Sequence, residues 1–137
     1  MFEPRSWMTL VLFMRRDAQR LLDIVAAAGA VAGYIAETGQ EQFLSGGLAH
    51  DAILRQLTVA GEAAFKISAE LQDRHAEIPW RKIIGFRHRV VHDYFGIDLD
   101  AVWRIATVEL PRLHADVIAI LAEEFPEGPS GQGDVSK

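Results

Sequence analysis

The fold is decided by residues 78–103, which read IPWRKIIGFRHRVVHDYFGIDLDAVW. Pro79 suits the first turn of a helix, because the N–H that proline lacks would have no partner there. Apolar residues then recur at helical spacing, at Ile83, Ile84, Phe86, Val90 and Val91. We expect this helix to end near Gly96. Asp98 can cap the next helix, because its carboxylate can accept from the free N–H groups of the first turn.

The same stretch holds the densest group of basic residues in an acidic chain of formal net charge -5. The basic side chains are Arg81, Lys82, Arg87, His88, Arg89 and His92. No carboxylate interrupts them before Asp93. The net charge argues against broad, non-specific binding to nucleic acid. We therefore expect any contact with RNA to be local, along residues 81–92.

Arg87 and His92 are suited to phosphate chemistry. They lie five positions apart, so at about 3.6 residues per turn they occupy adjoining sides of one helix and can lean into one cleft. Arginine holds a phosphate through two parallel hydrogen bonds, and histidine moves protons near neutral pH. Spacing alone leaves other interpretations open. Arg87 could pair with a carboxylate of a neighbouring helix, and His92 could be a buried, hydrogen-bonded histidine.

The pattern Arg87-x-x-x-x-His92-x-Tyr94, with its flanking residues, resembles the HepT family. These proteins are the HEPN-domain toxins of the MNT/HepT toxin–antitoxin systems. A second block, DAILRQL at residues 51–57 followed by GEAA at 61–64, resembles the preceding helix of the family. The resemblance covers roughly residues 15–121. Many relatives carry Asn or Asp where this chain has His88, and the residues before Met14 have no counterpart.

The resemblance implies a metal-independent endoribonuclease that uses no cofactor. His92 would act as the general base on a ribose 2′-hydroxyl, and Arg87 would hold the phosphate that this oxygen attacks. The products would be a 2′,3′-cyclic phosphate and a 5′-hydroxyl. Further contacts with RNA would come from Arg81, Lys82, His88 and Arg89.

The resemblance also implies partners. An MNT-type nucleotidyltransferase antitoxin would add AMP to Tyr94, and the bulky, negatively charged group would repel RNA. HEPN proteins typically pair as homodimers, which would bring two basic helices to one groove. Two alternatives stay open for the chain as a whole. It could be a non-catalytic module that binds a nucleotide or a partner protein, or a purely structural helical subunit.

Several other residues could be taken for functional ones, but the sequence favours structural interpretations of them. His88 and His92 have a spacing that can bind a metal, but no third ligand is evident in the sequence. Glu62 could be mistaken for a catalytic acid, and we assign it a structural role. Trp80 and Trp103 are expected to be packing residues.

The remaining sequence predicts an all-α, up-and-down bundle of four main helices. Besides the helix that follows Pro79, these span 15–35, 50–75 and 99–124, with a turn region at 37–47. Pro111 should bend or interrupt the last helix, because proline removes one helical hydrogen bond. The helical domain would cover residues 15–124, and residues 125–137 read as a disordered tail.

Residues 1–14 form an apolar N-terminal extension, which is interpreted either as a helix packed on the core or as a mis-assigned start upstream of Met14. No apolar run approaches the length needed to span a bilayer, so no membrane partner is expected. The chain contains no cysteine, which excludes disulfides and thiolate metal sites and is compatible with a cytoplasmic location.

Overall fold

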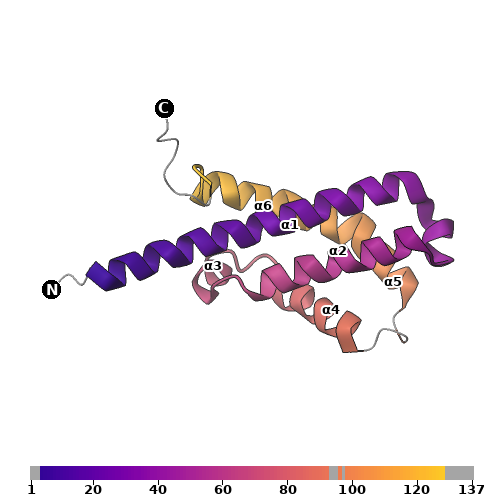
Figure 1. Ribbon diagram of the computed structural model, residues 1–137, viewed down its shortest axis with the longest axis horizontal. Coiled ribbons are helices and arrows are strands. Elements are labelled where there is room, and N and C mark those ends of the chain that lie inside the picture. Colours follow the sequence, from indigo (N-terminus) through magenta and orange to yellow (C-terminus); the bar gives the residue numbers. More distant parts are fainter. Residues whose placement is uncertain (1–3, 93–95, 97, 129–137) are drawn as a thin grey trace.

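The computed structural model describes residues 4–92, 96 and 98–128, and within these residues it contains helices and no strand (Figure 1). The helices are α1 (Pro4–Leu44), α2 (Leu48–Phe65), α3 (Ala69–Arg74), α4 (Trp80–His92), α5 (Leu99–Arg104), the π-helix η2 (Ile105–Glu109) and α6 (Leu110–Glu124). Helix α1 packs against α2 and α6, and α2 packs against α4. The predicted all-α bundle is confirmed.

Helix α1 supplies one side of the core through residues that recur every three or four positions. Leu21, Ile24 and Val31 are buried, and Phe43 is buried near the end of the helix. The helix runs further than the predicted 15–35, but both breaks expected within the turn region 37–47 are present, one at Gly39 and one at residues 45–47 after the end of the helix. Gly39 has φ 75° and ψ 163°, values that other residues rarely adopt, and helical structure resumes after it.

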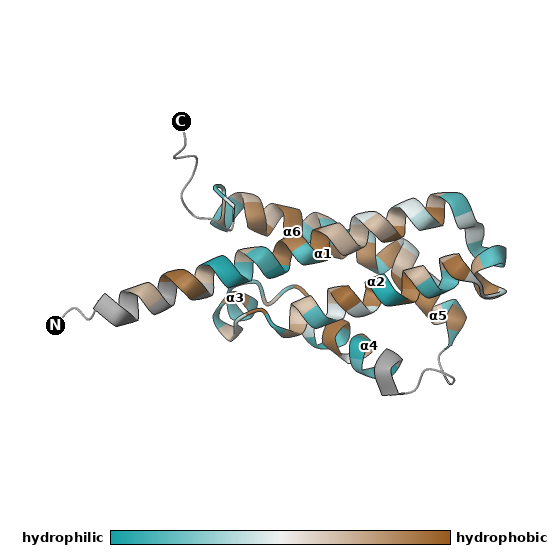
Figure 2. Cartoon of the chain, in the orientation of Figure 1, coloured by the Kyte–Doolittle hydropathy of each residue, from teal (hydrophilic) through white to brown (hydrophobic). Residues whose placement is uncertain are grey.

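The N-terminal part of α1 continues past the bundle (Figure 1), and the coloured part of it includes hydrophobic residues (Figure 2). Met8, Leu12 and Met14 are 58%, 48% and 47% exposed, so these side chains are not packed on the core as one interpretation of the sequence expected. By length and composition alone, Met14–Leu44 could cross a membrane, although no such run was expected. A core helix passes the same test, and this stretch contains the buried stripe of α1.

The single helix predicted for 50–75 is divided into α2 and α3. Ser68 adopts an extended conformation between them, and its hydroxyl accepts a hydrogen bond from the N–H of Leu71. Asp17 of α1 accepts from both the N–H and the hydroxyl of Ser68, at 2.9 and 2.6 Å. The N-cap of α3 is therefore bonded to a buried carboxylate from a distant part of the chain, a tertiary contact that helical periodicity cannot reveal.

The predicted helix 99–124 is interrupted close to Pro111. Asp98 caps α5 as expected, accepting from the N–H groups of Asp100 and Ala101. The helix then widens into η2, where the N–H of Leu110 donates to the carbonyl of Ile105. Because Pro111 has no N–H to donate, the ordinary ladder cannot continue through it, and the wider turn precedes it.

A cluster of charged groups joins α3 to the end of α6. Arg74 donates two hydrogen bonds to the carboxylate of Glu124, from Nη2 at 2.6 Å and from Nε at 3.2 Å. The ring of the buried His75 contacts the same carboxylate through Nε2. The hydrogen bonds from Arg74, and then that from His75, lower the pKa of Glu124 below its ordinary value of 4.5.

This lowered pKa gives a pH dependence of stability with a defined sign. A carboxyl whose folded pKa is depressed stabilises the folded state above its unfolded pKa, and the contribution is lost as the pH falls through the folded pKa. We expect Glu124→Gln to lower the free energy of unfolding at pH 7 by roughly 1–2 kcal/mol, because Arg74 is half exposed and screened by solvent. Wild type should also lose more stability than the variant below pH 4.5.

Chemical unfolding at several pH values checks this prediction. Glu123→Gln is the matched control, because Glu123 is the preceding residue of α6 and is exposed. Parallel pH profiles for wild type and Glu124→Gln would contradict the assignment.

Candidate active site

Helix α4 is held on the bundle by its apolar side. It begins directly after Pro79, as predicted, and the carbonyl of Pro79 accepts the N–H groups of Lys82 and Ile83. Trp80 is buried, and its indole N–H donates to the carbonyl of His75 at 3.0 Å. Ile83, Ile84 and Phe86 pack against the core. These contacts fix the rotation of α4, and therefore the direction of its polar residues.

Helices α2 and α4 lie in close contact at Gly61. A Cβ atom at this position would lie 2.4 Å from the Cβ of Arg87 and 3.2 Å from the carbonyl oxygen of Ile83. Real side chains do not approach to 2.4 Å, so only glycine allows the two helices to be this close. Gly61 therefore determines how close the Cβ of Arg87 lies to α2.

The residue after Gly61 contacts the charged end of Arg87. The Nε of Arg87 lies 2.8 Å from Oε1 of Glu62, although its N–H is not aligned to form a hydrogen bond, so the contact is an ion pair. The guanidinium carbon lies 5.9 Å from the centre of the Phe65 ring. The Nε atom is buried while the side chain as a whole is 32% exposed. Three neighbouring positions of α2 thus restrict the position of one arginine.

The interpretation of Arg87 as the partner of a carboxylate on a neighbouring helix is therefore realised in this structure. It is compatible with a functional role, since an arginine fork has further nitrogens beyond Nε. Sequence reasoning assigned Glu62 a structural role and did not connect it with Arg87. One signal in the sequence could have revealed this contact. Gly61 lies inside a predicted helix, where glycine is unfavourable, and close packing of another helix at that position would explain it. Glu62 would then lie beside that packed helix.

The other predicted RNA-binding residues lie on the outer side of α4. Arg81, Lys82, His88 and Arg89 are exposed. Lys82 forms an ion pair with Glu109 of η2, with Nζ 3.1 Å from Oε1. These four side chains therefore share a solvent-facing surface, whereas the Cβ of Arg87 faces α2.

His92 is the last residue of α4. Its side chain, and the whole of Asp93 and Tyr94, lie outside the described residues. The predicted catalytic role of His92 and the predicted modification of Tyr94 therefore stay predictions. Within the part of the chain that the structure describes, no group of three His, Cys, Asp or Glu side chains is placed to hold a metal ion.

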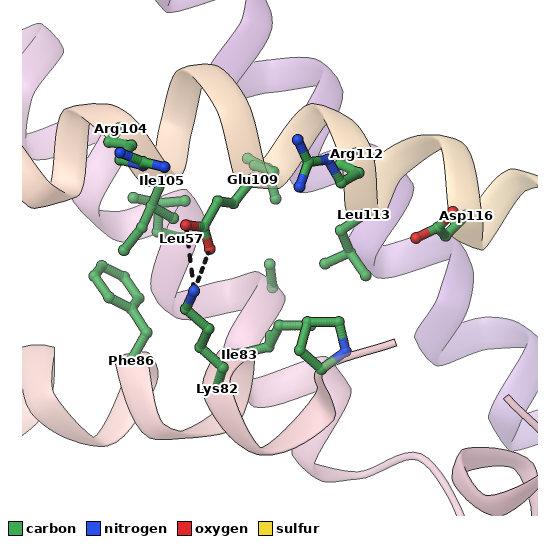
Figure 3. A pocket seen from close by; sticks show the side chains of 13 residues that line it. Leu57, Lys82, Ile83, Phe86, Arg104, Ile105, Glu109, Arg112, Leu113 and Asp116 are labelled. Carbon is green, nitrogen blue, oxygen red and sulfur yellow. Dashed lines mark hydrogen bonds and ion pairs between the residues drawn. The ribbon is translucent and has the colours of Figure 1, made fainter. Parts of the chain in front are cut away.

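A groove opens between α4 and the η2–α6 segment (Figure 3). Its volume is about 330 Å³, within the range of small-molecule sites. The floor is apolar, with Phe86 reaching from α4 toward Ile105 on the opposite wall. The ion pair between Lys82 and Glu109 crosses the opening.

Comparison with known proteins agrees with the sequence resemblance. A family profile described as Ribonuclease HepT-like matches residues 24–120. A protein of Thermococcus cleftensis named "Probable ribonuclease HepT" is 32% identical over 99 residues, which is 72% of this chain and 90% of that protein. A protein of Methanocaldococcus jannaschii, named as a candidate RNase, is 28% identical over 104 residues, or 75% of this chain and 95% of that protein. No solved structure matches the chain.

Proposed function

Since the chain belongs to the Ribonuclease HepT-like family, we propose that it is a metal-independent endoribonuclease that cleaves RNA by transesterification. The ribose 2′-oxygen attacks the adjacent phosphorus and forms a 2′-O–P bond while the P–O5′ bond breaks. His92 takes the proton of the 2′-hydroxyl, and the leaving 5′-oxygen takes a proton from water. The products are a 2′,3′-cyclic phosphate and a 5′-hydroxyl, so DNA, which has no 2′-hydroxyl, is not cut.

The observation that carries this proposal is the way α2 holds Arg87. Glu62 engages Nε at 2.8 Å, and Phe65 lies under the guanidinium. The two terminal nitrogens can then present a preset fork to a phosphate, which arginine binds through two parallel hydrogen bonds. A group already oriented for the charge that builds up on the phosphate oxygens costs little reorganisation during the reaction.

The wider system is also part of the proposal. We place this chain as the toxin of a cytoplasmic toxin–antitoxin pair, neutralised when a nucleotidyltransferase antitoxin adds AMP to Tyr94. The added phosphodiester would carry negative charge into the basic surface of α4 and exclude RNA. A homodimer would place two such surfaces around one groove, which offsets the net charge of -5 on each chain.

Cleavage of total RNA in the presence of EDTA tests the proposed activity. The purified protein should produce fragments that end in 2′,3′-cyclic phosphate, and it should leave single-stranded DNA intact. The mass of the protein is measured first, because AMP on Tyr94 would silence it. An unmodified protein that binds mononucleotide but cuts no RNA at any concentration would instead identify a non-catalytic binding module.

Glu62 is expected to be a positioning residue, which acts on RNA only through Arg87. Glu62→Ala should lower kcat by up to about 10²-fold with a small change in KM, because a displaced arginine loses transition-state contacts more than ground-state binding. Glu62→Gln keeps the shape and should retain part of the activity. Steady-state kinetics on a defined RNA separate kcat from KM. Equal losses for both variants, or a loss confined to KM, would contradict this role.

A further inference from the structure

Gly85 stands at the centre of the exposed side of α4, although glycine weakens a helix. No packing explains it, because a Cβ at Gly85 would meet nothing within 4 Å, in contrast to Gly61. Arg81 and Lys82 precede it by about one turn, and His88 and Arg89 follow it by about one turn. A glycine between four exposed basic residues leaves room for the backbone of an anionic polymer to lie close to the helix.

The groove beside this surface has walls suited to a flat, apolar group. The Phe86 ring, from α4, points toward Ile105 on the opposite wall (Figure 3), and Leu110 and Leu113 also line the groove. Aromatic side chains in such positions stack with nucleic-acid bases whatever their sequence. The groove has a volume of about 330 Å³ and lies between α4 and the η2–α6 segment.

The rim of the groove is more basic than the rest of the chain. Arg104, Arg112 and Lys82 contribute three positive charges, against two negative charges from Glu109 and Asp116. Glu109 is paired with Lys82. Arg104 and Arg112 are exposed, and neither forms a hydrogen bond or ion pair with the described residues. Two guanidinium groups are therefore available to anions on the wall opposite α4.

We propose that this groove is a base-binding subsite for unpaired RNA. The base stacks on Phe86, Arg104 and Arg112 contact the flanking phosphates, and the strand crosses α4 over Gly85 toward Arg87. The proposal rests on the proposed ribonuclease function and adds its substrate class. A base can enter such a groove only when it is free of its complement, so single-stranded RNA is the substrate and duplex RNA is not.

A second copy of this chain is a weaker candidate for the occupant. In the homodimer proposed above, two α4 surfaces flank a shared RNA, whereas insertion of a second α4 into this groove would place its basic residues directly against Arg104 and Arg112. RNA carries the complementary charge and supplies both parts that the groove accommodates, a flat base and anionic phosphates. Charge complementarity therefore favours the nucleic acid.

Binding of RNA that cannot be cut tests the subsite apart from catalysis. Short, fluorescently labelled 2′-O-methyl RNA lacks the attacking hydroxyl and can be titrated with the wild-type protein. We expect the single strand to bind about tenfold more tightly than the same strand in a duplex, or than a base-free strand of equal charge, because one stacked base contributes about that much. Affinity is measured by fluorescence anisotropy at one fixed salt concentration.

Variants of the groove should change this affinity in opposite directions. Phe86→Leu keeps an apolar side chain and should remove most of the preference for bases while leaving binding of the base-free strand unchanged. Arg112→Gln should weaken binding of both strands. Glu109→Gln should strengthen it, because it removes a negative charge and releases Lys82. Arg55→Gln and Glu41→Gln make the same charge changes at exposed positions elsewhere and should have no effect.

The following results would overturn the base-binding proposal. Equal affinity for base-bearing and base-free strands would mean that the groove holds no base, while RNA cleavage by wild type would leave the ribonuclease function standing. Absence of both cleavage and binding would reject both. Dissociation of a dimer by Arg112→Gln without a change in RNA affinity would make the groove an interface between copies. Arg112 is exposed, so this variant keeps the test decisive even if Phe86→Leu unfolds.

Discussion

Alanine at His92 is expected to lower the rate of RNA cleavage by about 10²–10⁴-fold, the usual contribution of a positioned general base. The loss should appear in kcat, because the imidazole acts on the 2′-hydroxyl only as the reaction proceeds. His114→Ala is the control, since His114 lies on α6 and lines neither the groove nor the surroundings of Arg87. Initial rates on a defined RNA provide the measurement.

Arg87→Ala should reduce cleavage by a comparable factor, about 10²–10³-fold, through loss of charge stabilisation on the phosphate. Arg87→Lys restores the positive charge without the planar fork, so it should recover little of the activity. The fold should survive both changes. Glu62 would lose one partner and keep Lys66, whose Nζ lies 3.4 Å from its Oε2; its side chain is 37% exposed, and such pairs contribute roughly 0–1 kcal/mol.

These two sets of variants also decide between chemistry and binding. In the binding-module alternative, neither residue has a rate to lower. In the purely structural alternative, the thermal midpoint falls and no activity is affected. Cleavage by His92→Ala at the wild-type rate would reject the proposed mechanism, even if the protein remains a ribonuclease, because the proton of the 2′-hydroxyl would then have another acceptor.

Local signals in the sequence predicted much of the fold. Pro79 at the start of α4 and Asp98 at the cap of α5 act through their own backbones and nearest neighbours, so each could be read without tertiary information. Pro111 likewise marked the interruption of the last helix. The all-α class follows from the apolar period, which is a property of each segment alone.

The features that sequence reasoning missed depend on contacts between segments that are distant in sequence. The break between α2 and α3 is fixed by Asp17, which lies 51 residues from Ser68. Glu62 was assigned a structural role, but its pairing with Arg87 was not predicted, because that requires knowing how α2 lies on α4. Residue types and spacing pointed to Arg87. The neighbours that orient it could be found only once the two helices were packed together.

Gly61→Val is expected to cause the largest combined loss of stability and activity. Even the Cβ of alanine would lie 2.4 Å from the Cβ of Arg87, a contact with the base of that side chain and not with its flexible end. Overpacking of this kind costs about 1–3 kcal/mol, whereas replacing a helical glycine with alanine gains about 1 kcal/mol. For Gly61→Ala the two effects partly cancel. Valine adds two methyl groups to the clash and has a lower helix propensity, so the loss dominates.

The sensitivity of catalysis should exceed that of stability at Gly61. To relieve the clash α4 must move away from α2, and Arg87 moves with it, out of reach of Glu62. A displacement of about 1 Å can cost about 10²-fold in rate, so Gly61→Ala should lose activity while its thermal midpoint changes little. Gly33→Ala, in α1 with no atom within 4 Å of the new Cβ, should gain stability and keep full activity. Full activity in a stably folded Gly61→Ala protein would show that the close approach of α2 and α4 does not position Arg87 for the reaction.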